Sequence, residues 1–282
     1  MHSPIDVRRV IVVVLDGLRP DAIDEFDLKE LRRLSRIGAS SMCARTVAPS
    51  LTWPALTSLM TGVEPNVHGI LEDAVHFPRP RARLNPLPEL LGEAGYPSYA
   101  FMGAVPPLYR LMAKRIAKGL GIAEALFAGK NALEVLKTAR PTLTQQREGF
   151  VFMHWADADI VGHQHCWMSK EYGEAARVMD AALDQLVDMT SIAADPNSLL
   201  ILLADHGGGG VVDNHHADPH PLNWTIPFVM VGGAVVPQEL NAPSLLDVPA
   251  TVAWALGASI HPSYTGRVLS EAFDVAAEPA VA

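Results

Sequence analysis

The sequence predicts an α/β fold, an open and doubly wound, mostly parallel sheet with helices on both faces. Short, unbroken apolar runs rich in β-branched residues recur along the chain, as expected for strands covered on both faces. Helical patterns lie between these runs, which favours a layered α/β arrangement. Several runs end directly in carboxylate or imidazole side chains, and such sheets bind ligands at the carboxyl ends of their strands.

Length and composition indicate a single domain over residues 1–282. Nearly half of the 282 residues are apolar, enough for a sizeable core. The net charge of −9 and the lack of a polybasic segment argue against binding to nucleic-acid polymers or to anionic membranes. The N-terminal apolar run is too short for a signal peptide, and no run approaches a membrane span, so we expect a cytoplasmic protein. The sequence gives no indication of oligomeric state.

The expected strands are short and strongly apolar. They are VIVVVL (10–15), SYAFM (98–102), GFVFM (149–153), LLILLA (199–204) and IPFVMV (226–231). Leucines at helical spacing predict a helix over 27–37, with Gly38 as its C-terminal cap. Residues 171–189 also have an amphipathic helical pattern. The segment 103–148 is typical of a helical insertion over the sheet. Its basic residues either form a solvated helix face or contact the remote end of a substrate.

The run ADADIVGHQH (156–165) contains a candidate pair of metal ligands. Asp159 and His163 are four residues apart, so on one helical turn they share a face and one ion. Asp157 lies six residues before His163, and His165 lies two residues after it, so neither shares that face. We therefore expect His154, Asp157 and His165 to support the ligands or the fold.

A second candidate lies in LADHGGGG (203–210), where Asp205 and His206 follow a strand. Adjacent residues can reach one ion there, because the chain is turning. The glycines either let this loop pass close to the site or simply make it flexible. The loop lacks the Lys-Ser/Thr ending of a P-loop. Three later histidines, His215, His216 and His220, could complete a metal site, and the residues alone hardly rank them.

Residues 48–70 hold a candidate nucleophile. Pro54 suits the first turn of a helix and Gly62 suits its end. Thr52 then lies at the helix N-terminus, where free amide groups stabilise an oxyanion. A hydroxyl beside a metal can ionise and attack as a nucleophile, although a threonine here could also only cap the helix.

Together these motifs resemble the alkaline phosphatase superfamily, and within it the type I phosphodiesterase/nucleotide pyrophosphatase family. The resemblance rests on VVLDGLRPD, SLTWPALTSLMTG with the following HGI, the D-x-x-x-H pair, ADHG and a late His before TIPFVMVGG. Their order and spacing match over roughly residues 8–235. The resemblance implies an alkaline phosphatase-like fold and a hydrolase acting on phosphoester bonds of a small phosphorylated substrate.

The resemblance also implies roles for individual residues. Thr52, before Trp53-Pro54, matches the nucleophile. Asp16, Asp205 and His206 match the ligands of one zinc. Asp159 and His163 match two ligands of a second zinc. A late histidine completes that second site, and the spacing from the TIP segment favours His216 over His215 and His220.

Two divalent ions, preferably Zn²⁺, suit this mixture of imidazole and carboxylate ligands, although Mn²⁺ or iron would also fit. They bring four positive charges against three ligand carboxylates, so the site attracts an anionic phosphoryl group. The ion at Asp16 would activate Thr52, and the ion at Asp159 would stabilise the leaving oxygen. The phosphoryl group would pass to Thr52 and then to water.

Two substrate-binding positions are notable. Trp53 could stack on an aromatic leaving group or could pack in the core. The family usually places an asparagine shortly after HGI, where it donates to a phosphate oxygen, but this chain has Asp73. A carboxylate there repels a phosphate unless it is protonated, binds a cation or points away.

Several alternatives remain at this point. A phosphomonoesterase or a phosphonate hydrolase of the same superfamily would use the same residues. Sulfatases need a C/S-x-P-x-R context, which neither Cys43 nor Thr52 has. A cofactor-independent phosphoglycerate mutase would be larger and would use serine, and haloacid dehalogenases need an Asp where Leu18 stands. A non-catalytic metal-binding scaffold is the alternative from a different class.

Overall fold

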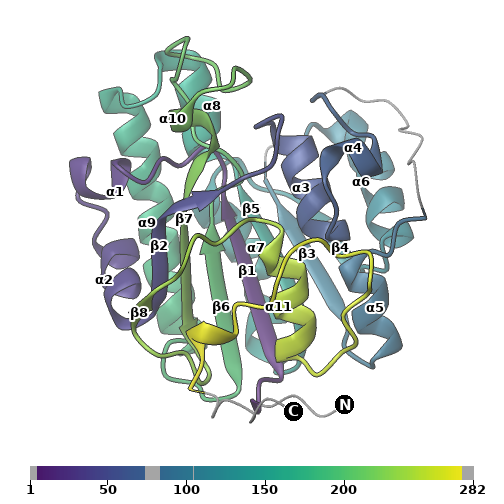
Figure 1. Ribbon diagram of the computed structural model, residues 1–282. Coiled ribbons are helices and arrows are strands. Elements are labelled where there is room, and N and C mark those ends of the chain that lie inside the picture. Colours follow the sequence, from purple (N-terminus) through teal and green to yellow (C-terminus); the bar gives the residue numbers. More distant parts are fainter. Residues whose placement is uncertain (1–4, 74–82, 104, 275–282) are drawn as a thin grey trace, which may run out of the picture.

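The computed structural model describes residues 5–73, 83–103 and 105–274. An eight-stranded sheet runs through the molecule, with helices on both faces (Figure 1). The strands, in spatial order, are β4 (Glu124–Phe127), β3 (Ser98–Met102), β5 (Gly149–Trp155), β1 (Arg9–Leu15), β6 (Ser198–Leu203), β7 (Thr225–Gly232), β2 (Ala39–Arg45) and β8 (Gln238–Glu239). The strands from β4 to β6 are parallel, whereas β7 runs antiparallel to both β6 and β2. The predicted fold class is therefore confirmed.

The centre of the sheet is formed by the most apolar runs. Every residue of β5, β1 and β6 is buried, because helices cover both faces of these strands. All five predicted strands are present. Three further strands, β2, β4 and β8, were not predicted, because they are short or only partly apolar and lie toward the edges of the sheet.

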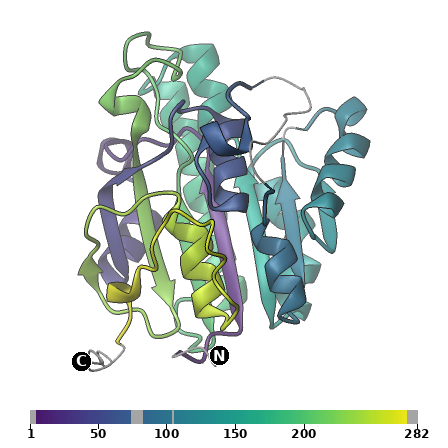
Figure 2. The same cartoon turned by 45° about the vertical axis from the view of Figure 1, so that its right-hand side comes forward.

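The helices form two layers around the sheet. They are α1 (Ala22–Glu25), α2 (Lys29–Ile37), α3 (Thr52–Thr61), α4 (Pro65–His68), α5 (Leu87–Glu93), α6 (Pro107–Gly119), α7 (Ala132–Gln145), α8 (Asp157–His165), α9 (Lys170–Thr190), α10 (Pro221–Trp224) and α11 (Asp247–Ala255), with a 3₁₀ turn at Ser270–Ala272. Helices α2, α7 and α9 pack together on one face, while α3, α5 and α11 pack together on the other (Figure 2). Among the described residues, no helix is both long and apolar enough to cross a bilayer.

The segment 103–148 differs in one respect from the expected helical insertion. It does contain two long helices, α6 and α7. Between them, however, β4 pairs in parallel with β3 and extends the edge of the sheet. Its sequence, EALF, has no β-branched residue, so the pattern gave no strand signal. Part of this segment therefore belongs to the sheet itself.

The predicted helix ends are correct in position but differ in mechanism. Gly62 ends α3 with φ of 68°, a left-handed conformation that glycine adopts without strain. Gly38 ends α2 with extended backbone, at φ of −119°, so it is not a left-handed cap. A Cβ atom at Gly38 would lie 2.0 Å from the carbonyl oxygen of Met230. Glycine is needed there because the chain passes against β7.

Candidate metal centre and nucleophile

Three adjacent central strands bring polar side chains together at their carboxyl ends. Asp16 directly follows β1, His154 lies near the end of β5, and Asp205 comes two residues after β6. The three strands are parallel and β1 lies between the other two, so their carboxyl ends meet. All three side chains are at least 95% buried. Burial of such groups is costly unless they bind a partner or an ion.

The first predicted ligand group is close together. Nε2 of His206 lies 3.3 Å from Oδ1 of Asp16 and 3.6 Å from Oδ2 of Asp205. The other oxygen of Asp205, Oδ1, accepts hydrogen bonds from the amides of Gly17 and His206, at 3.2 Å and 3.0 Å. Asp205 is therefore fixed by one oxygen and keeps the second for another partner.

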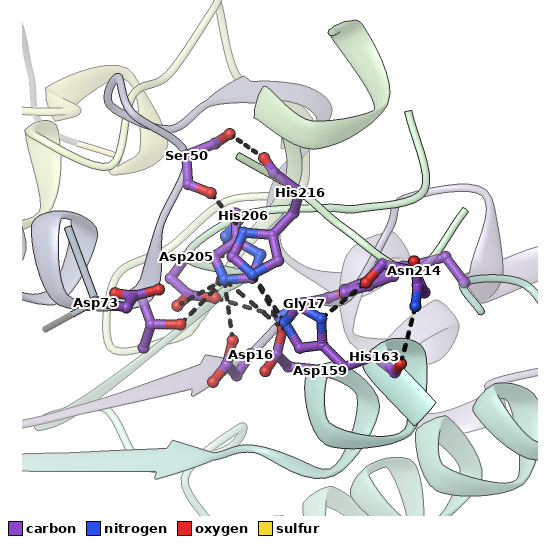
Figure 3. Close-up of polar contacts among 12 residues, drawn as sticks. Asp16, Gly17, Ser50, Asp73, Asp159, His163, Asp205, His206, Asn214 and His216 are labelled. Atoms are coloured by element: carbon purple, nitrogen blue, oxygen red, sulfur yellow. Dashed lines mark hydrogen bonds and ion pairs between the residues drawn. The ribbon is translucent and has the colours of Figure 1, made fainter. Parts of the chain in front are cut away.

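The second predicted group adjoins the first. Asp159 and His163 lie one turn apart on α8, and His163 Nε2 is 3.4 Å from Asp159 Oδ1. Nε2 of His216 lies 3.6 Å from the same oxygen and 3.1 Å from Nε2 of His163. Nε2 of His206 is 4.0 Å from Asp159 Oδ1, so the two groups adjoin. Figure 3 shows these side chains pointing toward one another.

The hydrogen bonds of three histidines fix which ring nitrogen can bind a metal. Nδ1 of His163, His206 and His216 lies 2.7–2.8 Å from the backbone carbonyl of Asn214, Gly207 and Ser50 respectively. A carbonyl can only accept, so Nδ1 carries the proton and donates it. In the neutral ring Nε2 then presents its lone pair, as in metal-ligating histidines. The lone pairs of His163 and His216 face each other, which a cation between them would stabilise.

The carboxylates provide a second indication that the cluster can hold cations. Oδ1 of Asp16, Oδ1 of Asp159 and Oδ2 of Asp205 are buried and have no hydrogen-bond donor among the described residues. Burial, followed by the charge of Asp205, raises the pKa of Asp16 well above its ordinary value. Burial and the nearby His206 lower the pKa of His216 to about 3, which keeps this ring neutral. Unpaired carboxylate oxygens beside a neutral imidazole fit divalent cations.

His154 lies closer to the site than the sequence analysis expected. Its Nε2 is 3.0 Å from Oδ2 of Asp16, and neither ring nitrogen has a hydrogen-bond partner among the described residues. With Asp16 and Asp205 it forms a buried group whose potential ligand atoms lie within 4.8 Å of one another. The other such group consists of Asp159, His206 and His216. His154 is thus a further candidate ligand, which its place at the end of a buried strand could have suggested.

Thr52 lies beside the first group. It is the first residue of α3, and its Oγ1 is 3.1 Å from Nε2 of His206. Ser50, two residues before Thr52, holds the chain that leads into α3 against the second group. Its Oγ donates to the His216 carbonyl at 2.6 Å, and its carbonyl accepts from His216 Nδ1. These hydrogen bonds fix the start of α3 relative to the His216 ring.

The glycine run after His206 forms a tightly packed loop. Gly207 and Gly208 are buried, and a Cβ atom at Gly208 would lie 2.0 Å from the Trp167 ring. That ring donates from Nε1 to the Gly17 carbonyl at 2.9 Å, which links the loop to the chain after β1. Of the two interpretations of this run, close packing near the site is the correct one.

The remaining candidates lie around the centre. Trp53 is 43% exposed beside Thr52, so its ring is not part of the core. Asp73 accepts a hydrogen bond from the Trp53 amide at 2.8 Å. Of the three late histidines, His216 places a ring nitrogen 3.6 Å from Asp159 Oδ1, whereas His215 only packs its ring edge-on against that of His163. His215 is exposed, and His220 accepts from the Leu222 amide as the cap of α10.

Asp157 and His165 play no part in the cluster. Asp157 accepts hydrogen bonds from the Ala132 amide at the start of α7, at 3.2 Å and 3.0 Å, so its role is structural. Burial raises its pKa to about 6. His165 is exposed at the end of α8.

Comparisons with known families agree with this arrangement. The family model of type I phosphodiesterases and nucleotide pyrophosphatases matches residues 10–87, which include Asp16, Thr52 and Asp73. The metalloenzyme superfamily model matches residues 99–260, which include the other candidate ligands. The second match alone covers more than half of the chain.

Curated relatives match over smaller parts. The chain is 31% identical to GPI ethanolamine phosphate transferase 1 of Chaetomium globosum over 105 residues, which cover 37% of this chain and 11% of that protein. It is 24% identical to ectonucleotide pyrophosphatase/phosphodiesterase family member 1 of Rattus norvegicus over 224 residues, which cover 68% of this chain and 23% of that protein. The chain thus spans at most about a quarter of the length of these relatives.

Solved structures share the fold. Murine ectonucleotide pyrophosphatase/phosphodiesterase 5, as an inactive variant in complex with AMP, matches with a TM-score of 0.71 at 14% identity, over 94% of this chain and 100% of that chain. A protein of the alkaline phosphatase superfamily from Vibrio parahaemolyticus matches with a TM-score of 0.70 at 16% identity, over 95% and 72%. A 2-O glycosaminoglycan sulfatase matches with a TM-score of 0.72 at 14% identity, over 95% and 74%. The chain therefore belongs to the metalloenzyme superfamily and has the alkaline phosphatase-like fold that its motifs predicted.

Proposed function

We propose that this protein is a phosphoester hydrolase that acts on small phosphorylated substrates and prefers phosphodiesters. The reaction would pass through a phosphothreonine intermediate on Thr52. The observation that carries the proposal is the position of Thr52 Oγ1, 3.1 Å from an imidazole nitrogen of a buried cluster of carboxylates and histidines. The match of residues 10–87 to type I phosphodiesterases supports the choice of diesters.

The cluster would hold two divalent cations, and zinc suits its ligands best. Asp16, Asp205 and His206, with His154 in reach, would bind one of them. Asp159, His163 and His216 would bind the other. When bound, the two cations would lower the pKa of the Thr52 hydroxyl and stabilise charge on the phosphoryl and leaving oxygens.

The residues of the chain supply orientation and the nucleophile. The start of α3 places Thr52 Oγ1 in the cluster, and its first-turn amides favour anionic oxygens. The Thr52 hydroxyl gives its proton to solvent and its oxygen attacks phosphorus, while the bond from phosphorus to the leaving oxygen breaks. The leaving oxygen takes a proton from water. A water molecule then cleaves the phosphothreonine, restores the hydroxyl and releases the phosphate product.

The experiment compares three chromogenic esters on zinc-loaded protein. Bis-p-nitrophenyl phosphate tests diesters, p-nitrophenyl phosphate tests monoesters and p-nitrophenyl sulfate tests the chemistry of the sulfatase neighbour. We expect the highest kcat/KM with the diester, and loss of this activity after chelation with recovery on adding Zn²⁺. Absence of turnover of all three by protein shown to contain two zinc ions would contradict the proposal and favour a metal-binding scaffold.

A transferase is the second candidate, because the chain also resembles GPI ethanolamine phosphate transferase 1. The same intermediate would then pass its phosphoryl group to an alcohol rather than to water. Repeating the diester assay in the presence of an acceptor alcohol such as glycerol separates the two outcomes. Formation of a p-nitrophenyl phosphate ester of the alcohol, at the expense of the hydrolysis product, would identify the transferase.

A further inference from the structure

The carboxylate of Asp73 occupies a position beside the nucleophile that suits a substrate oxygen. Its Oδ1 accepts a hydrogen bond of 2.8 Å from the amide of Trp53, the residue that follows Thr52. This amide belongs to the first turn of α3, whose N–H groups have no partner within the helix. Figure 3 shows Asp73 on the same side of the cluster as Asp205. The protein thus places its own anion on a donor next to Thr52 Oγ1.

The position of Asp73 changes the number of donors that a phosphoryl group can use. A phosphomonoester has three terminal oxygens and two negative charges, whereas a phosphodiester has two terminal oxygens and one charge. With the Trp53 amide already engaged, the third oxygen of a monoester lacks this donor and faces a carboxylate. A protein charge that repels a competing ligand is a general means of achieving specificity.

The charge of the site points in the same direction. Two divalent cations against Asp16, Asp159 and Asp205 leave a charge of about +1, and Asp73 brings this to about zero. The negative charge of Asp73 repels those of Asp16, Asp159 and Asp205, so Asp73 is close enough to influence the electrostatics of the cluster. A second negative charge on the substrate therefore gains less attraction than it would in the absence of Asp73.

We propose that Asp73 is a specificity-determining residue that selects monoanionic phosphodiesters against dianionic phosphomonoesters. This inference rests on the proposed phosphoesterase function and names its substrate class. Asp73 lies at the exposed rim of the site, so its effect is screened by salt.

The test is Asp73→Asn, which removes the charge and restores a side chain that can donate to phosphate. On zinc-loaded protein at low ionic strength, we expect the ratio of kcat/KM for bis-p-nitrophenyl phosphate to that for p-nitrophenyl phosphate to fall roughly fivefold or more. Inorganic phosphate, measured by calorimetry, should bind tighter by a similar factor. Both changes should shrink as salt is added.

Glu72→Gln is the matched control, because it removes the same charge from the neighbouring, exposed position. We expect this variant to keep the ratio and the phosphate affinity of the unaltered protein. An unchanged ratio and unchanged phosphate binding in Asp73→Asn, or equal changes in both variants, would overturn the inference. Failure of the proposed function is distinguishable, because neither ester would then be hydrolysed by the unaltered protein, and phosphate binding still compares the two variants.

Discussion

Oγ1 of Thr52 lies 3.1 Å from Nε2 of His206, although 153 residues of sequence separate the two side chains. Thr52 is brought there by the start of α3, and His206 by the loop that leaves β6. His206 donates from Nδ1 to the Gly207 carbonyl, so in the neutral ring its Nε2 would present a lone pair to the hydroxyl. A cation bound by both groups would activate the hydroxyl as a nucleophile.

The choice among the late histidines can be tested by metal content. His216→Ala removes a buried Nε2 that lies 3.6 Å from Asp159 Oδ1 and 3.1 Å from His163 Nε2. We expect the zinc content of the purified protein to fall from about two ions per chain to about one. His215→Ala alters the exposed neighbour and should retain both ions. Equal zinc content in the two variants, measured by mass spectrometry of the metal, would refute this assignment.

Metal removal should lower thermal stability. The unpaired oxygens of Asp16, Asp159 and Asp205 lie close together, so a cation that binds only the folded state stabilises it by mass action. At free Zn²⁺ about 100-fold above its Kd this amounts to about 2.7 kcal/mol. We expect calorimetry to show a Tm several degrees lower after chelation, with recovery on adding Zn²⁺. A Tm that is independent of Zn²⁺ would mean that the cluster binds no ion.

His68 should make stability depend on pH below neutrality. It is buried, its Nδ1 accepts from the Ile70 amide, and its Nε2 lies 3.0 Å from Ser58 Oγ on α3. Burial lowers its pKa to about 4. The unfolded chain therefore binds this proton first as pH falls, and stability decreases between about pH 6.5 and pH 4.

The expected loss from His68 is at most about 3.5 kcal/mol, because one pKa unit corresponds to about 1.4 kcal/mol. Urea unfolding of chelated protein should therefore show a steeper acid decline than in His68→Gln, which lacks the titrating group. Chelation removes the pH dependence of zinc binding from the comparison. Parallel pH profiles for the two proteins would show that His68 does not contribute.

Gly38 provides a test of the packing between α2 and the sheet. A Cβ atom there would lie 2.0 Å from the Met230 carbonyl oxygen, a backbone atom that cannot move away without displacing β7. We expect Gly38→Ala to lower the free energy of unfolding by about 2–4 kcal/mol. Gly92→Ala, in α5 with open space around it, should be neutral or slightly stabilising. A neutral Gly38→Ala in urea unfolding would show that β7 and the end of α2 are not packed in this way.

The sequence allowed the central strands and most of the site to be predicted, because buried parallel strands are continuous apolar runs that end at ligand residues. It did not predict β2 or β4, whose pairing depends on neighbours far away in the chain. The pair of Asp159 and His163 followed from helical spacing alone. The place of His154 beside Asp16 could not be derived in this way, because it depends on the parallel register of β1 and β5.

Trapping a covalent intermediate shows whether Thr52 forms a bond to phosphorus. Zinc-loaded protein is mixed with bis-p-nitrophenyl phosphate, quenched in acid within the first turnover and digested for mass spectrometry. We expect a p-nitrophenyl phosphoryl group on the peptide that contains Thr52, and its absence, together with loss of hydrolysis, in Thr52→Ala. Undiminished diester hydrolysis by Thr52→Ala would contradict this expectation.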